Sequence, residues 1–223
     1  MAPLSYLSKA FELSRVFLFK WTVNWRFLGE EVFLSQPFSQ ALLVAHASLL
    51  ALFTATRWLG PSDYTLLEAV KALVSLDESP NPATTATSPA EPGPSAKPEP
   101  QPSMRSQHQA ETSRRVTPTF IMTVVLQSML IGCLCARSLH YQFYAYIAWS
   151  TPFLMWRSGL GPIPTALVWA AQEWAWNVYP STTASSITVV ACLATALAAS
   201  WYGTRETSEN LGIEKDTRSK KTA

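Results

Sequence analysis

Residues 174–204 read WAWNVYPSTTASSITVVACLATALAASWYGT, which is 31 residues without one charged side chain. An α-helix of about 20 residues is long enough to cross the roughly 30 Å hydrocarbon core of a bilayer. The stretch therefore predicts a membrane helix. We place it at residues 185–203, because Pro180 marks the end of whatever helix precedes it.

Four more stretches of the chain lack charge in the same way, and each predicts a further membrane helix. They cover residues 37–56, 116–136, 138–156 and 158–172, with 20, 21, 19 and 15 residues. The expected helices lie at about 38–57, 118–136, 141–157 and 162–178. A buried helix of a soluble protein explains one such run but not five in 223 residues, because too little polar surface remains to cover them. The predicted fold class is all-α, a polytopic membrane protein with about five transmembrane helices.

The composition shows that the chain is made of two very different materials. Charged residues make up 14% of it, against roughly 25% in soluble proteins. Residues 77–118 hold nine of the sixteen prolines and predict a disordered loop, since nothing there can form a core. The mean hydropathy of +0.09 averages these two materials. A net charge of +2 gives no reason to expect nucleic-acid binding.

These patterns divide the chain into six segments. We expect a luminal or interfacial segment, a membrane helix, a short cytosolic amphipathic helix, a disordered cytosolic loop, four membrane helices with short loops, and a cytosolic tail. Their ranges are 1–36, 37–58, 59–76, 77–117, 118–203 and 204–223.

The distribution of lysine and arginine predicts the orientation. With the C-terminus in the cytosol, five spans place 12 of the 17 basic residues on the cytosolic side, as the positive-inside rule favours. Lys220 and Lys221, the fourth and third residues from the end, resemble a dilysine signal for retrieval to the endoplasmic reticulum. The alternative is a solvated basic tail.

Most of the unusual polar residues then fall on the luminal side: Asn24, Arg26, Glu30, Glu31, residues 137–142 and residues 173–177. An ionisable group beside a membrane span is costly unless it is paired or hydrated. Glu173 is such a group, and Arg26, Arg137 and His140 are candidates either to pair with it or to hold an anionic phosphate. The alternatives are that Arg137 extends to the lipid headgroups, that His140 is an ordinary interfacial residue, and that the neighbouring aromatic residues form an interfacial belt.

The three cysteines do not have the spacing of a zinc site or of a paired disulfide framework. All of them, Cys133, Cys135 and Cys192, fall in expected membrane helices and are interpreted as packing residues. We expect neither a metal nor another cofactor.

Three longer blocks resemble a known family. They are residues 19–33, which contain FKWTVNWRFL and EEVF, residues 135–144 (CARSLHYQFY) and residues 173–182 (EWAWNVYPST). In this order they resemble the dolichyl-phosphate-mannose-dependent alpha-1,3-mannosyltransferases of asparagine-linked glycosylation. The resemblance covers nearly everything except the proline-rich loop and the tail.

The resemblance implies a partial GT-C-type architecture in the endoplasmic reticulum membrane. The implied reaction moves mannose from dolichyl phosphate mannose to Man5GlcNAc2-PP-dolichol in an alpha-1,3 bond, so the expected partners are this donor, the lipid-linked acceptor and the bilayer. GT-C enzymes take an aspartate base from a first luminal loop, whereas the first aspartate here is Asp63, on the expected cytosolic side. Family members are also about twice as long. We therefore expect a C-terminal half whose catalytic base belongs to a missing N-terminal half, with no catalytic residue in this chain.

For this half the resemblance implies binding roles. Arg137 and His140 are expected at the donor phosphate, with Tyr141 and Gln142 shaping the pocket. Arg26 and Asn24 are the next candidates, for phosphate or sugar hydroxyls. Glu173 is expected to orient Arg137 or His140. The alternative function is a catalytically inactive accessory or scaffold protein derived from the same family.

Overall fold

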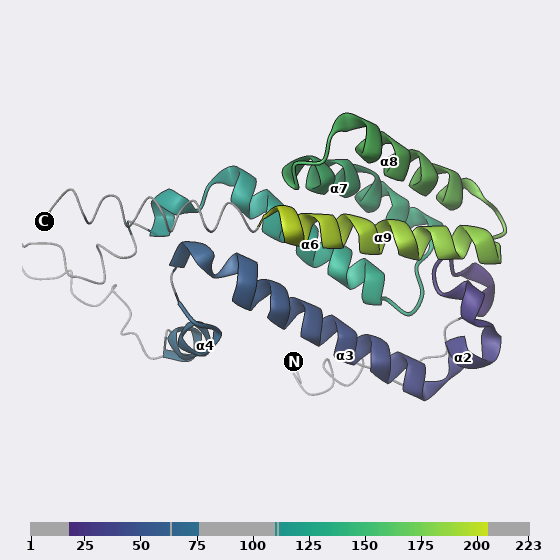
Figure 1. Ribbon diagram of the computed structural model, residues 1–223. Coiled ribbons are helices and arrows are strands. Elements are labelled where there is room, and N and C mark those ends of the chain that lie inside the picture. Colours follow the sequence, from purple (N-terminus) through teal and green to yellow (C-terminus); the bar gives the residue numbers. More distant parts are fainter. Residues whose placement is uncertain (1–17, 63, 76–109, 111, 205–223) are drawn as a thin grey trace, which may run out of the picture. The chain divides into compact units, whose positions relative to one another are not determined.

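The computed structural model describes residues 18–62, 64–75, 110 and 112–204 (Figure 1). Within these ranges the regular elements are helices and there is no strand, so the prediction of an all-α fold is confirmed. The expectations for residues 1–17, for most of the proline-rich loop and for the dilysine-like end lie outside the described residues.

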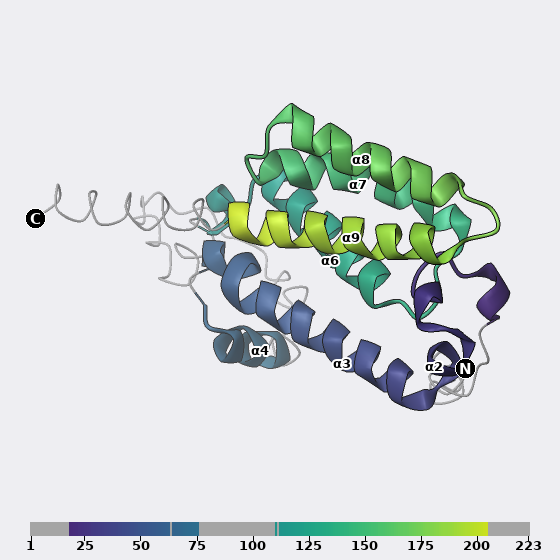
Figure 2. The same cartoon turned by 45° about the vertical axis from the view of Figure 1, so that its right-hand side comes forward.

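The chain divides into two compact units, of which the first comprises residues 1–51 and 123–223. Its centre is formed by α7 (Tyr144–Arg157), α8 (Pro162–Asn177) and α9 (Thr183–Gly203), which pack side by side (Figures 1 and 2). Leu154, Val189 and Leu193 are fully buried between them. Burying such side chains from water or headgroups is worth roughly 1.5–3 kcal/mol each, and close packing adds to this inside a membrane.

Two buried polar pairs join helices of this unit. Gln127 of α6 (Pro118–Cys135) donates from Nε2 to Ser200 Oγ of α9 at 3.3 Å. Thr151 of α7 donates from Oγ1 to Gln172 Oε1 of α8 at 2.8 Å. A polar side chain in an apolar interior needs such a partner, so these pairs hold the helices in register.

Among the described residues, three helices are long and apolar enough to cross a membrane: Gln36–Trp58 with 23 residues, Pro118–Cys135 with 18 and Thr183–Gly203 with 21. The first consists of α3 (Gln36–Phe53) and a π-helical turn, Thr54–Trp58. At 1.5 Å per residue, the 14 residues of α7 and the 16 of α8 reach about 21 and 24 Å, which is less than the roughly 30 Å of a hydrocarbon core. The chain is an all-α membrane protein, and crossing by α7 and α8 stays a prediction.

Local interactions determine where the helices begin and end. The helix expected from residue 141 begins at Tyr144, because Tyr141–Phe143 form a 3-10 turn. α9 begins at Thr183, earlier than expected, because Thr182 and Ser185 form a reciprocal capping box. At the other end of α9, a Cβ on Gly203 would lie 2.3 Å from the Cα of Ser158, so only glycine fits this close approach.

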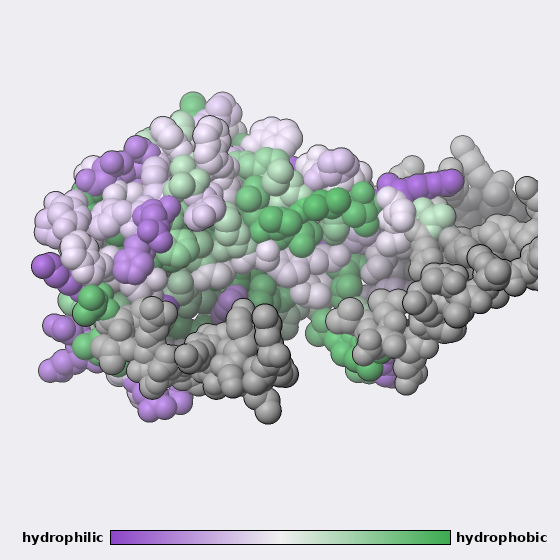
Figure 3. Space-filling model, turned by 180° about the vertical axis from the view of Figure 1, so that it is seen from behind, coloured by the Kyte–Doolittle hydropathy of each residue, from purple (hydrophilic) through white to green (hydrophobic). Residues whose placement is uncertain are grey.

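The first described residues of this unit, 18–34, form short helical turns: Phe19–Trp21, Arg26–Leu28 and α2 (Glu30–Leu34). Gly29, with φ of 82°, links the last two, a conformation that glycine adopts without strain. These turns lie at the end of the bundle where α8 connects to α9 (Figure 1). On the face seen in Figure 3, hydrophilic residues gather toward one end of the bundle and hydrophobic residues lie over its middle.

The second unit, residues 52–122, contains the short helix α4 (Leu66–Ser75). Thr65 and Glu68 form a capping box at the start of this helix. Glu68 Oε2 accepts from Thr65 N and from Thr65 Oγ1 at 2.8 Å each, and Glu68 N donates to Thr65 Oγ1 at 3.3 Å. Leu67, Val70 and Val74 are exposed along one side. α4 is therefore amphipathic, and its position at the membrane surface stays a prediction.

Candidate functional site

The three motif blocks, residues 19–33, 135–144 and 173–182, meet at one end of the helical bundle. The turns of the first block lie beside the α8–α9 connection in both ribbon views (Figures 1 and 2). Backbone atoms of the first two blocks also pair, since Val23 N donates to Leu139 O at 3.0 Å. Segments more than 100 positions apart in sequence thus form one cluster.

Asn24 is the centre of a buried hydrogen-bond system that we call the Asn24 clasp. Its Oδ1 accepts from the Thr22 hydroxyl at 2.8 Å and from Leu139 N at 2.8 Å, and its Nδ2 donates to Ala136 O at 2.7 Å. Thr22 and Asn24 are inaccessible to solvent. The predicted binding residue Asn24 therefore has its carboxamide engaged inside the protein, where it joins the first block to the second.

Arg26 follows a strained residue and is tied to α9. Trp25 has φ of 53°, a left-handed conformation that is uncommon for a bulky side chain and costs of order 1 kcal/mol or more. The resulting bend lets Arg26 N donate to the buried Ser186 Oγ at 2.8 Å. The guanidinium lies 4.8 Å from the centre of the Phe19 ring, and its Nη1 donates to the carbonyls of Phe19 and Lys20 at 3.2 and 3.4 Å. These bonds use one nitrogen of a group that carries five donors.

Arg137 is half-buried and lies against the end of α2. Its Nε donates to Phe33 O at 2.9 Å, and its guanidinium is 5.5 Å from the centre of the Phe33 ring. Burial lowers the pKa of Arg137 from its ordinary value, but a guanidinium stays charged in proteins. A fixed positive charge therefore stands at this end of the bundle.

Two other predicted residues of the second block, His140 and Gln142, are exposed. Leu139 beside them is buried, and the next turn is closed by a bond from Phe143 N to His140 O at 3.0 Å. The backbone that carries both side chains is thus held by the Asn24 clasp and the 3-10 turn, while the side chains point outward.

Tyr141 belongs to an aromatic group that joins all three blocks. Its hydroxyl donates to Val178 O at 2.9 Å, and its ring lies 5.6 Å from that of Tyr179. Tyr179 in turn stacks on Trp21 at 6.4 Å between ring centres. Aromatic faces next to hydrogen-bonding groups are typical of sugar and lipid-headgroup contacts.

Glu173 has partners other than those expected. Its carboxylate accepts from the Tyr144 hydroxyl and from Asn177 Nδ2, the latter at 3.0 Å. The predicted orientation of Arg137 or His140 by Glu173 is not found among the described residues. The reason is geometric: the start of α7 lies beside the end of α8, where Tyr144 also packs on Trp176 at 5.7 Å.

Tyr144 and Asn177 were not among the predicted site residues. Asn177 follows Glu173 by four positions, the spacing at which side chains on a helix are neighbours, so the sequence spacing is enough to predict this contact. Tyr144 lies in the second block, where the sequence offers an aromatic belt as an alternative interpretation and gives Tyr144 no specific role. Its pairing with Glu173 depends on how two helices pack, and no sequence spacing reports that.

The cluster offers fixed positive charge, exposed donors, aromatic faces and a hydrogen-bonded carboxylate. Among the described residues there is no group of three or more histidine, cysteine, aspartate or glutamate side chains that could hold a metal ion. The arrangement suits binding of an anionic or hydroxyl-rich ligand at a membrane interface.

Fold and cluster together define a class, the all-α membrane proteins that carry a polar and aromatic site at one end of a helical bundle. Residues 1–186 of the chain match the family described as ALG3 protein. The chain belongs to this family.

Individual relatives carry the same description of activity. A Dol-P-Man:Man(5)GlcNAc(2)-PP-Dol alpha-1,3-mannosyltransferase of Neurospora crassa is 48% identical over 204 residues, which are 92% of this chain and 41% of the relative. The proteins of the same name from Homo sapiens and Arabidopsis thaliana are 36% and 35% identical, and the aligned parts are 39% and 37% of their lengths. The chain thus spans about two fifths of the length of these relatives. No solved structure matches it.

Proposed function

We propose that this chain contributes the substrate-binding end of a mannosyltransferase, which transfers mannose from dolichyl phosphate mannose to Man5GlcNAc2-PP-dolichol in an alpha-1,3 bond. The observation that carries the proposal is the meeting of the three motif blocks at one end of the bundle. Family membership and the names of the relatives supply the substrate classes.

The geometry supports a division of roles within the cluster. Arg137 and His140 bind the donor phosphate, and Tyr141 and Gln142 shape the pocket beside them. Arg26 adds a second guanidinium with donors left for phosphate or sugar hydroxyls. The carboxylate of Glu173, held by Tyr144 and Asn177, is suited to accept hydrogen bonds from sugar hydroxyls.

Asn24 takes a different role in this proposal from the one its sequence suggested. Its carboxamide already makes three bonds inside the protein, so it holds the loop of Arg137 and His140 rather than a ligand. We assign no catalytic base to this chain.

The charge distribution supports a membrane orientation for the proposed enzyme. With 12 of 17 lysines and arginines in the cytosol, the cluster faces the lumen of the endoplasmic reticulum and the C-terminus faces the cytosol. Single cysteines introduced at Gln142 and near the C-terminus, labelled with a membrane-impermeant maleimide in sealed microsomes, test this: only the C-terminal cysteine should react.

The activity is tested with a chimera in which the aligned segment of the Neurospora crassa relative is replaced by this chain. We expect the chimera to restore addition of the sixth mannose in cells that lack the enzyme, and the Arg137→Ala and His140→Ala variants to lose most of that activity while remaining in the membrane. Lipid-linked oligosaccharides are resolved by chromatography. A chimera that folds but never transfers mannose supports the accessory-protein alternative.

A further inference from the structure

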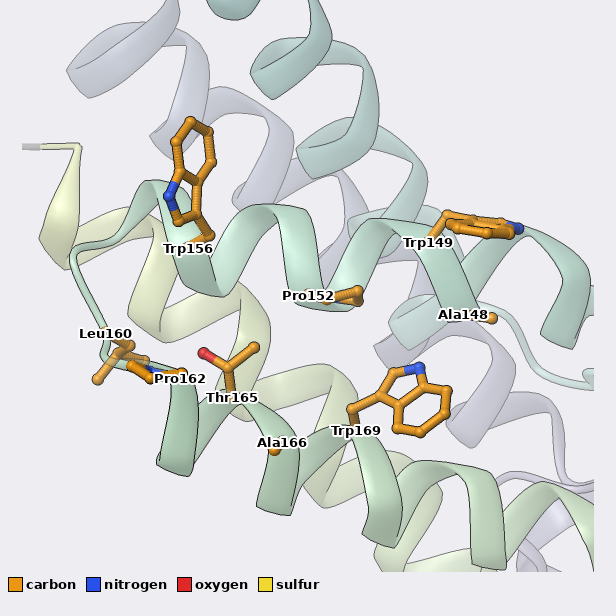
Figure 4. Close-up of a pocket in the computed structure, with 9 residues that line it drawn as sticks. All are labelled: Ala148, Trp149, Pro152, Trp156, Leu160, Pro162, Thr165, Ala166 and Trp169. Atoms are coloured by element: carbon orange, nitrogen blue, oxygen red, sulfur yellow. The ribbon is translucent and has the colours of Figure 1, made fainter.

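α7 and α8 enclose a groove that none of the proposed binding residues lines. Its volume is about 580 Å³, within the roughly 300–1,000 Å³ usual for small-molecule sites. The walls are almost wholly apolar, with Trp149, Pro152 and Trp156 from α7 opposite Pro162, Ala166 and Trp169 around α8. In Figure 4, Pro152 and Trp169 point toward the space between the two helices.

The groove runs into the motif cluster along the same pair of helices. Ala148, at its near end, follows Tyr144 by four residues on α7, and Trp169 precedes Glu173 by four on α8. Residues four apart lie on one helix face, about 6 Å along the axis. The hydrogen-bonded Tyr144 and Glu173 therefore lie about one helical turn beyond the end of the groove that faces the cluster.

The lining favours a flexible apolar chain as occupant over another helix. Helices that pack in membranes meet through small residues that allow their backbones to approach. The lining of this groove contains three tryptophans beside small residues such as Ala148 and Ala166, and the bulky indole of Trp149 is 80% exposed, which hinders the close approach of a further helix. Broad aromatic faces offer a large apolar contact area to a flexible, methyl-branched hydrocarbon chain.

We propose that the groove holds the first isoprenoid units of a polyprenyl phosphate, with the chain leaving the motif cluster at Tyr144 and Glu173 and running between α7 and α8 toward Trp156. The inference rests on the proposed function, which requires a lipid-linked substrate at the cluster. A lipid whose phosphate lies at residues 137–142 must extend its tail into the bilayer. The groove is the apolar path that begins one helical turn from that cluster.

The test uses the full 223-residue chain in phosphatidylcholine nanodiscs with a diazirine-bearing farnesyl phosphate as probe. After irradiation, labelled peptides are mapped by mass spectrometry. We expect labels concentrated on residues 148–169 and competed by unlabelled dolichyl phosphate. Ala166→Trp fills the groove and should reduce labelling at least tenfold. Ala194→Trp, an equally large change at an exposed position of α9, should leave labelling unchanged.

A second variant tests the groove independently, in case Ala166→Trp fails to fold. Trp169→Ala removes one wall without adding bulk and should also weaken labelling about tenfold. The proposal is overturned if both groove variants label like the unsubstituted chain, or if a diazirine phosphatidylcholine gives the same map, which identifies ordinary bilayer lipid as the occupant. Mannose transfer by the chimera tests the proposed function separately. If the chimera transfers mannose but the groove is not labelled, the lipid site in the groove is excluded and the proposed function stands.

Discussion

The Asn24 clasp and the exposed turn that carries His140 and Gln142 are adjacent, yet their side chains have opposite surroundings. Asn24 is inaccessible and its carboxamide makes three hydrogen bonds within the protein. The side chains of His140 and Gln142, which follow the residues that Asn24 bonds, are exposed. Polar motif residues thus fall into two classes. Buried ones, such as Asn24, hold the loops of the site in place (building residues), and exposed ones, such as His140, are available to a ligand (binding residues).

The largest expected effect comes from breaking the clasp. Asn24→Ala leaves Leu139 N–H and Ala136 C=O without their partner, while the Thr22 hydroxyl keeps its bond to the backbone carbonyl of residue 24. Unsatisfied buried groups cost about 1–3 kcal/mol each. We expect a loss of about 3 kcal/mol in the free energy of unfolding, measured by denaturant titration in detergent micelles.

The matched control for the clasp is Asn177→Ala, which removes the same carboxamide from an exposed position. Its free energy of unfolding should change by less than about 0.5 kcal/mol. Equal destabilisation by the two substitutions would show that burial does not separate building residues from binding residues.

For the exposed residue His140, we expect a substitution to change activity without changing stability. His140→Ala in the chimera removes one proposed hydrogen bond to a charged phosphate, worth about 1.5–3 kcal/mol, so kcat/KM should fall roughly 10- to 100-fold. The melting temperature should stay the same. His46→Ala, in α3 and away from the motif blocks, is the control and should keep full activity.

Tyr144 is intermediate between the buried and the exposed motif residues, since it is half-buried and its hydroxyl bonds Glu173. Tyr144→Phe keeps the ring contact with Trp176 and loses one hydrogen bond, so transfer should fall about fivefold, which corresponds to roughly 1 kcal/mol. Tyr146→Phe, at an exposed position two residues on, should have no effect. If Tyr144→Phe instead lowers stability and leaves transfer unchanged, Tyr144 belongs with the building residues.

The smallest effect is expected at a fully exposed carboxylate outside both regions. Bonds from Thr65 N–H and Oγ–H hold the pKa of Glu68 below its ordinary value of 4.5, so the cap stabilises α4 above that pH and is lost as pH falls through the lowered pKa. A peptide of residues 62–76 in zwitterionic micelles should lose helicity below about pH 4.5 in circular dichroism. The Glu68→Gln peptide should be less helical at pH 7 and should respond less to acid, since Asp63 is then its only side chain that titrates in acid.

Much of the fold followed from charge-free stretches, because a bilayer excludes charge over a fixed thickness and helices must satisfy their own backbone. The count of spans did not follow in the same way. α7 and α8 are shorter than a membrane span, since Tyr141–Phe143 form a separate turn and Asn177 ends α8. A charge-free run does not fix the length of its helix, since α7 has 14 residues against a run of 19 and α8 has 16 against a run of 15.

For the site, sequence alone determined which blocks matter, because long stretches such as residues 19–28 and 173–182 carry specific residue orders that local chemistry does not require. It did not determine the use of each residue. Asn24 was expected at a ligand and makes internal bonds, while Glu173 was expected beside Arg137 or His140 and bonds Tyr144. Tertiary structure decided these outcomes. A polar side chain is available to a ligand only if no partner inside the protein already bonds it. The partners of Asn24 lie more than 100 positions away and that of Glu173 more than 20, and only the packing of the chain brings them within hydrogen-bond distance.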